Sequence, residues 1–142
     1  MRTRLFAAPF ALFLLLTSVG IAAADTTPPA ETNLSIVVTS ATVEVQTGVV
    51  TVTGQITCEV ALYDLSANVD ITKGSVSGSG DEIGLSCAAG ETVPFTISFS
   101  ADSGRFSPGP VDMGLEAQGV GHGQRYGFVT EGLNSIVLEP TR

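Results

Sequence analysis

The sequence has few of the side chains that carry catalysis or hold metals. It contains no Trp, one His and two Cys, and its six Lys and Arg residues are outnumbered by 14 Asp and Glu. The single histidine, His122, has no second His with which to bind zinc, and no Gly-x-Ser-x-Gly motif marks an activated serine. Gly121 and Gly123 flank His122, so nothing local would hold its imidazole as a general base. We therefore expect no enzymatic activity and no cofactor.

The shortage of basic residues also limits the partners. Nucleic acids and anionic lipid surfaces are bound largely through Lys and Arg that neutralise phosphates, so neither is expected here. Acidic stretches such as Asp81-Glu82, or Asp102, leave calcium as an alternative. The twelve-residue loop with regularly spaced acidic ligands is absent, however, and we predict no metal site.

The first 24 residues have the pattern of a secretory signal peptide. Arg2 and Arg4 precede an apolar run from Leu5 to about Leu16, and Ala22-Ala23-Ala24 supplies small residues for cleavage. The alternative, a retained transmembrane anchor, needs roughly 20 apolar residues. We predict cleavage after Ala24 and find neither a lipid-anchoring cysteine nor a second apolar tail after it. The mature protein is expected to be secreted, extracellular and free of a membrane anchor.

Cleavage would leave 118 residues, the size of one domain, with a net charge of about −10 because two of the six basic residues are lost. Residues 25–33 include Pro28-Pro29 and are predicted to form an extended leader. The folded domain is predicted over residues 34–142. Its acidic balance suits solubility outside the cell, or a cationic partner, and a monomer is expected.

Apolar and polar residues alternate along the mature chain, and no window has the 3.6-residue period of a helix. Seven to nine short strands with turns about every ten residues predict an all-β, immunoglobulin-like Greek-key β-sandwich. The buried Trp usual in that fold is missing, so Phe95 and Phe99 are expected to fill its volume. The predicted strands are Leu34–Thr39, Thr42–Gln46, Val50–Val60, Leu65–Thr72, Ile83–Cys87, Thr92–Ser100, Val111–Gln118, Gly127–Thr130 and Asn134–Glu139.

The alternation also predicts which side chains face the core. Val43 and Val45 are expected to point inward, as are alternate residues of Val50–Val60 and Leu65–Thr72. Gly74–Asp81 is predicted to be a Gly/Ser-rich loop, followed by inward-facing Ile83, Leu85 and Cys87. Glu131-Gly132 is predicted to be a turn. Pro94 cannot donate to a ladder, which indicates an edge strand or a bulge.

Cys58 and Cys87 both fall on predicted inward faces, 29 positions apart. They do not form a Cys-x-x-Cys motif, and an exported chain meets oxidising conditions. We predict a structural disulfide between them.

Several motifs in order resemble a family of small exported proteins. They are Gly54-Gln55-Ile56-Thr57-Cys58, the second cysteine Cys87, the strand Val93–Phe99 and the turn Gly104-Arg105-Phe106-Ser107-Pro108-Gly109. This pattern is similar to single-disulfide immunoglobulin-like domains of unknown function from high-GC Gram-positive bacteria, although the Trp that often precedes their last turn is absent. The resemblance implies a bacterial, exported sandwich. A weaker resemblance is to the neocarzinostatin-type apoproteins, which carry two disulfides and hold a small apolar ligand in a cleft.

Two functions are compatible with these observations. The first is an exported, non-enzymatic binding module that contacts an unknown protein or cell-envelope component through loops on a rigid sandwich. The predicted binding loop is Gly119–Tyr126, which gathers His122, Gln124, Arg125 and Tyr126; its alternative is a flexible connector. The second function is a carrier of a small apolar ligand, for which a deep apolar cleft would be needed.

Overall fold

The computed structural model describes residues 34–142, and the side chains within that range other than those of 128–135. These residues form seven β-strands and no helix, which confirms the all-β prediction; in particular, none of them belongs to a helix that could cross a membrane. The predicted signal peptide, 1–24, and leader, 25–33, lie outside the described residues. The strands are β1 (Leu34–Glu44), β2 (Val50–Cys58), β3 (Leu62–Lys73), β4 (Val76–Cys87), β5 (Thr92–Phe99), β6 (Gly109–Gly121) and β7 (Gln124–Thr141).

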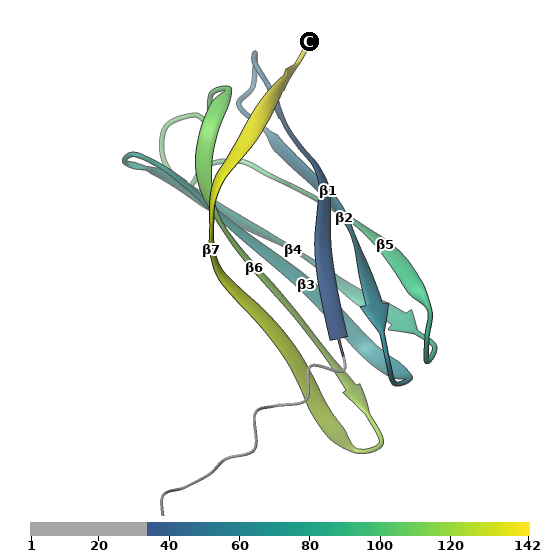
Figure 1. The fold of residues 1–142 in the computed structure, drawn as a ribbon. Coiled ribbons are helices and arrows are strands. Elements are labelled where there is room, and N and C mark those ends of the chain that lie inside the picture. Colours follow the sequence, from purple (N-terminus) through teal and green to yellow (C-terminus); the bar gives the residue numbers. More distant parts are fainter. Residues whose placement is uncertain (1–33) are drawn as a thin grey trace, which may run out of the picture.

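The seven strands follow the order β4-β3-β6-β7-β1-β2-β5 in one strongly bent sheet. Neighbours are antiparallel except for β1 and β7, which run parallel. The long strand β7 connects the two halves of the sheet, because it pairs with β6 over most of its length and with β1 only at Glu139–Thr141. The sheet curls nearly into a barrel, as Figure 1 shows.

The two ends of this order, β4 and β5, meet at a seam. There the backbone amide of Thr96 donates to Glu82 Oε2 over 2.6 Å, and the amide of Asp102 donates to the carbonyl of Ser77 over 2.9 Å. Individual hydrogen bonds, rather than a regular ladder, therefore join the strands at the seam. Pro94 is exposed on β5, the last strand in the order, which confirms its predicted edge position.

The core is built from the inward faces that the alternation predicts. The alternate residues of β2 from Val50 to Cys58 are all buried, as are those of β3 from Leu65 to Ile71. Phe95 and Phe99 are buried as expected. Phe106, which the sequence placed in a turn, joins them, and its ring meets that of Phe99 edge-on at a centroid distance of 6.2 Å. Three phenylalanines thus contribute large aromatic side chains to the core.

The predicted disulfide between Cys58 and Cys87 is present, with the two Cα atoms 6.2 Å apart. That separation lies in the usual range for a disulfide. Cys58 ends β2 and Cys87 ends β4, so the bond links the two halves of the sheet near the seam. Both cysteines are buried.

The first predicted strand boundary is wrong. Leu34–Thr39 and the first three residues of Thr42–Gln46 are parts of a single strand, β1, which has a bulge between Val38 and Ser40. The extra residue shifts the alternation by one position, which is why Ala41 and Val43 are both buried. Val45 lies beyond the end of β1 and is half exposed, contrary to prediction.

The predicted Gly/Ser-rich loop at Gly74–Asp81 is also wrong, because most of it belongs to β4. Only Gly74 and Ser75 form the turn, and Lys73 pairs with Val76. Gly80 faces inward, where a Cβ would lie 2.7 Å from Ile97 Cγ2 and 2.8 Å from Phe99 Cδ1. A glycine at this position lets the side chains of β5 approach β4 closely. Gly80 is therefore explained by packing between strands and not by a loop.

Farther along β4 the predicted inward face breaks at Ile83, which is 73% exposed. The pairing with β3 shifts register between the Leu65–Leu85 and Ala67–Glu82 pairs. Gly84, inside that shift, has a φ of 76°. The bulge turns Ile83 outward, while Leu85 stays partly buried.

The last two predicted strands, Gly127–Thr130 and Asn134–Glu139, are one strand, β7. The predicted turn at Glu131-Gly132 falls where the pairing with β6 shifts register. Residues that form turns are also common at bulges, where the strand continues in the same direction. The Glu131-Gly132 pair therefore marks a bulge in β7 and not a turn between two strands.

Candidate functional site

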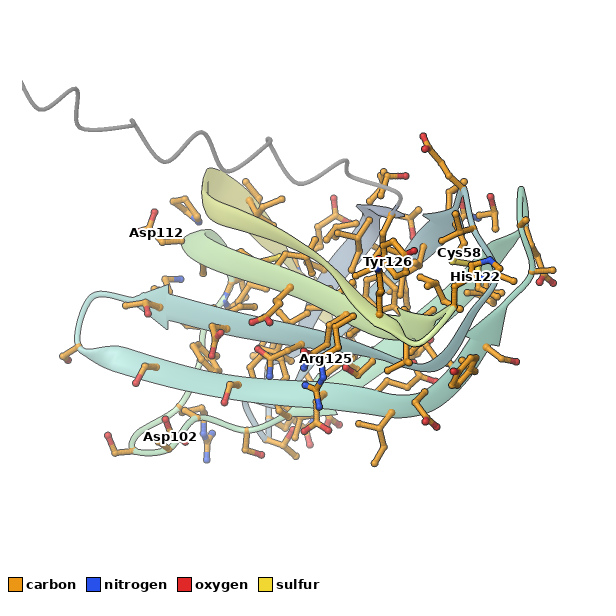
Figure 2. All side chains as sticks on the ribbon, turned by 90° about the horizontal axis from the view of Figure 1, so that it is seen from below. Cys58, Asp102, Asp112, His122, Arg125 and Tyr126 are labelled. Atoms are coloured by element: carbon orange, nitrogen blue, oxygen red, sulfur yellow. A yellow bond between two sulfur atoms is a disulfide. The ribbon has the colours of Figure 1, made fainter. Side chains whose placement is uncertain are left out.

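The predicted binding loop is a tight β-hairpin rather than a flexible connector. β6 ends at Gly121 and β7 begins at Gln124, so only His122 and Gly123 form the turn. Their φ angles are 48° and 74°, the pattern of a type I′ turn, whose twist matches that of the flanking strands. His122 is exposed at the tip, at the same end of the molecule as Cys58 (Figure 2).

Arg125 and Tyr126, predicted to act together, lie on opposite sides of this hairpin (Figure 2). Tyr126 pairs with Gly119 on the inner side and is partly buried against the core. A Cβ on the neighbouring Gly121 would lie 3.3 Å from Tyr126 Cε2, so the tyrosine ring occupies space that the glycine leaves. Tyr126 is therefore a packing residue in this structure, and only Arg125, Gln124 and His122 remain exposed.

Arg125 lies beside a surface hollow of about 200 Å³, lined by Asp64, Ser66, Gln118, Gly119, Val120 and Arg125. The hollow arises where β3 and β6 slip out of register. Tyr63 pairs with Val120 and Ser66 with Gln118, so β3 has one residue more than β6 between these pairs. Asp64, in this segment, has a φ of 51°, which is uncommon for a residue other than glycine. Strained backbone at a hollow is typical of sites that hold a side chain in a set position.

Charged and polar side chains line much of the hollow. Asp64 and Arg125 lie on its lining with opposite charges, and in the part of the chain that the structure describes neither enters an ion pair within 4 Å. Ser66 Oγ donates to the Gln118 carbonyl over 3.5 Å. The lining therefore carries a guanidinium, a carboxylate and an amide. Among the described side chains, no group of three His, Cys, Asp or Glu forms a metal site.

Among the described residues, the acidic residues considered for calcium belong to no group of three or more possible metal ligands. In Asp81-Glu82 the Asp81 side chain is exposed, whereas Glu82 turns toward β5 and accepts the hydrogen bond from Thr96 described above. Asp102 lies in the segment between β5 and β6, distant in Figure 2 from His122 and Cys58.

Sequence reasoning identified Arg125 but missed Asp64, Ser66 and Gln118. All three lie at outward or irregular strand positions, which alternation alone assigns to solvent. The available signal was the polar pair Tyr63-Asp64, which interrupts the alternation just before Leu65. That the interruption faces Arg125 depends on the pairing of β3 with β6, which is not a local property of the sequence.

Comparisons with protein-family models, with curated protein sequences and with solved structures found no match to this chain.

Proposed function

We propose that the protein is an exported, non-enzymatic interaction module with an immunoglobulin-like Greek-key fold, acting as a monomer. It recognises a protein or cell-envelope component through the hollow beside Arg125. Export is supported by the N-terminal signal pattern and by the disulfide, which suits an oxidising compartment. The bacterial resemblance noted in the sequence fits the same proposal.

The strand order supports the fold assignment. β4-β3-β6-β7 have the arrangement of the C′, C, F and G strands of a variable-type immunoglobulin domain, and β1-β2-β5 that of strands A, B and E. The disulfide is the departure: it links β2 to β4, whereas antibody domains link strands B and F. In this proposal the chain combines the immunoglobulin strand order with a disulfide at a different position.

The observation on which this proposal depends is the hollow at Arg125, which is lined by residues of the paired strands β3, β6 and β7, including Asp64 of β3. Arg125 is the second residue of β7, close to a two-residue turn, and it pairs with Val120 of β6. Arg presents several donors in a fixed planar arrangement, so it can bind a carboxylate of the partner through two parallel hydrogen bonds. Because four of the six residues that line this hollow carry polar side chains, it favours an interaction surface over the apolar-ligand carrier.

Affinity capture with a matched variant tests this proposal. Purified protein is immobilised and exposed to culture medium and envelope extract, and captured proteins are quantified by mass spectrometry. Arg125→Ala is expected to reduce capture of the principal partner by about tenfold or more. Arg142→Ala removes the same charge from an exposed position at the end of the described chain and is expected to have little effect.

Two results would count against the proposal: no protein enriched over a blank matrix, or equal capture by the wild-type and Arg125→Ala proteins. Thermal melting of both variants verifies that they are folded. Exposed substitutions of this kind usually change stability by no more than about 0.5 kcal/mol.

A further inference from the structure

A groove opens on another face of the molecule, between β1 and β7. The two strands pair only where Thr42–Glu44 meets Glu139–Thr141. Toward the start of β1 they separate, as Figure 1 shows. The resulting groove has a volume of about 320 Å³ and is lined by Val38, Thr39, Ser40, Ala41, Ile136, Val137 and Glu139.

Two strand edges face this groove. Over Leu34–Val38 and Ser40–Ala41, β1 pairs with β2 on one side, and no described strand pairs with it on the other. Over Gln124–Leu138, β7 pairs with β6 only. Exposed strand edges present backbone donors and acceptors in a row, and folded proteins usually protect them. The bulge at Thr39 interrupts this edge without covering it.

The side chains beside the groove are suited to an extended chain. Val137, in the lining, is 55% exposed, and Val37, next to the lining, is 59% exposed; Val38 and Ile136 are partly buried against the core. Glu139 is the charged residue of the lining, at the end where β1 and β7 converge. The whole chain is acidic, with a net charge of −8, so a basic group is the complementary one.

We propose that this groove binds an extended peptide segment of a partner protein, which adds a strand beside β1. Backbone hydrogen bonds to the free edge would supply the binding energy, small apolar side chains would contact the exposed valines, and a Lys or Arg of the peptide would pair with Glu139. This site is separate from the hollow at Arg125, so it goes beyond the proposed function and can exist whether or not that hollow binds.

The probe is an end-capped peptide of the sequence Lys-Val-Thr-Val-Thr-Val-Lys, titrated into the isotope-labelled full chain while backbone amide shifts are recorded by NMR. Saturable shifts are expected at Val37–Ala41 and Ile136–Glu139. The control peptide has the same side chains with its Thr amides N-methylated. It is expected to bind about tenfold more weakly, because it loses the donors of one edge.

Charge reversal supplies the second test. Glu139→Lys is expected to weaken binding of the Lys-ended peptide about tenfold and to favour a Glu-ended analogue. Glu116→Lys, at an exposed position of β6, is the matched control and is expected to leave both affinities unchanged. The proposal is overturned by shifts that map outside the groove, by no saturable shift up to about 1 mM peptide, or by equal binding of the N-methylated peptide.

Discussion

Gly54 lies where any Cβ would collide with its neighbours. A side chain there would overlap the Val37 carbonyl oxygen of β1 and the ring of Phe95 from β5. The glycine therefore allows the ring of Phe95, one of the largest fully buried side chains, to pack directly against the backbone of β2. The Gly-x-x-x-Cys pattern seen in the sequence thus has a packing cause at its first position and a disulfide at its last.

Gly54→Ala is expected to destabilise the protein by about 1–3 kcal/mol, because overpacking a buried position forces neighbours to shift. Gly114→Ala is the matched control: Gly114 is also a strand glycine, but its added Cβ would approach only Asp70, at 3.6 Å. The control should change stability by no more than about 0.5 kcal/mol. Urea unfolding of the two variants measures both values, and equal midpoints would show that Gly54 is not a packing requirement.

The β6–β7 hairpin is the element that positions Arg125. Its turn requires two consecutive residues with positive φ, and His122 meets that requirement at some cost because it is not glycine. Residues 124 and 126 face one side and residue 125 the other, because side chains alternate along a strand. A loop of the predicted length could have brought Arg125 and Tyr126 together, whereas a strand cannot.

Substitutions in the turn test this geometry. Gly123→Ala is expected to cost about 1–2 kcal/mol, since a residue with a Cβ is disfavoured at its φ of 74°. His122→Asn is expected to preserve or raise stability, because Asn is preferred at the first central position of a type I′ turn. Thermal melting distinguishes these outcomes. If both variants melt like the wild type, the segment is a flexible connector after all.

At the scale of the whole molecule, the fold depends on joining the two halves of a bent sheet. β7 connects them on one side through its pairing with both β6 and β1. On the other side, at the seam between β4 and β5, no ladder forms among the described strands; Thr96 and Asp102 donate hydrogen bonds across it, and Ile97 and Phe99 lie close to Gly80. The Cys58–Cys87 bond lies near this weaker side and holds together strands that no ladder connects.

Reduction of the disulfide should therefore lower stability substantially. The bond spans 29 positions, for which the chain-entropy model gives about 3.5 kcal/mol. Because the free energy of unfolding of a typical protein is roughly 5–15 kcal/mol, the disulfide would contribute a large share of it. The measurement is unfolding with and without reductant, alongside a Cys58→Ser/Cys87→Ser variant, with intact mass verifying the oxidation state. Two free thiols in the secreted protein, or an unchanged unfolding midpoint, would contradict the role of the bond.

Many of the strands and their buried faces could be predicted from the sequence, because apolar and polar residues alternate along each strand. The inward faces of β2 and β3, the buried Phe95 and Phe99 and the disulfide all followed from a period of two with polar residues between. Several of the errors lie at bulges. Bulges lie at Thr39, next to Ile83 and at the Glu131-Gly132 pair, and the sequence does not distinguish a place where the chain turns back from one where the pairing only shifts by one residue.

The sequence by itself determined that this chain is all-β, where most of its core residues lie and which two cysteines can meet, since alternate side chains of a half-buried strand are apolar. Only the tertiary structure decided that Arg125 shares a hollow with Asp64, that Tyr126 packs inward and that β1 and β7 part to leave a groove. The reason is that these features depend on the register between strands distant in sequence. Register is set by the packing of the whole sheet around Phe95 and its neighbours, not by any one segment.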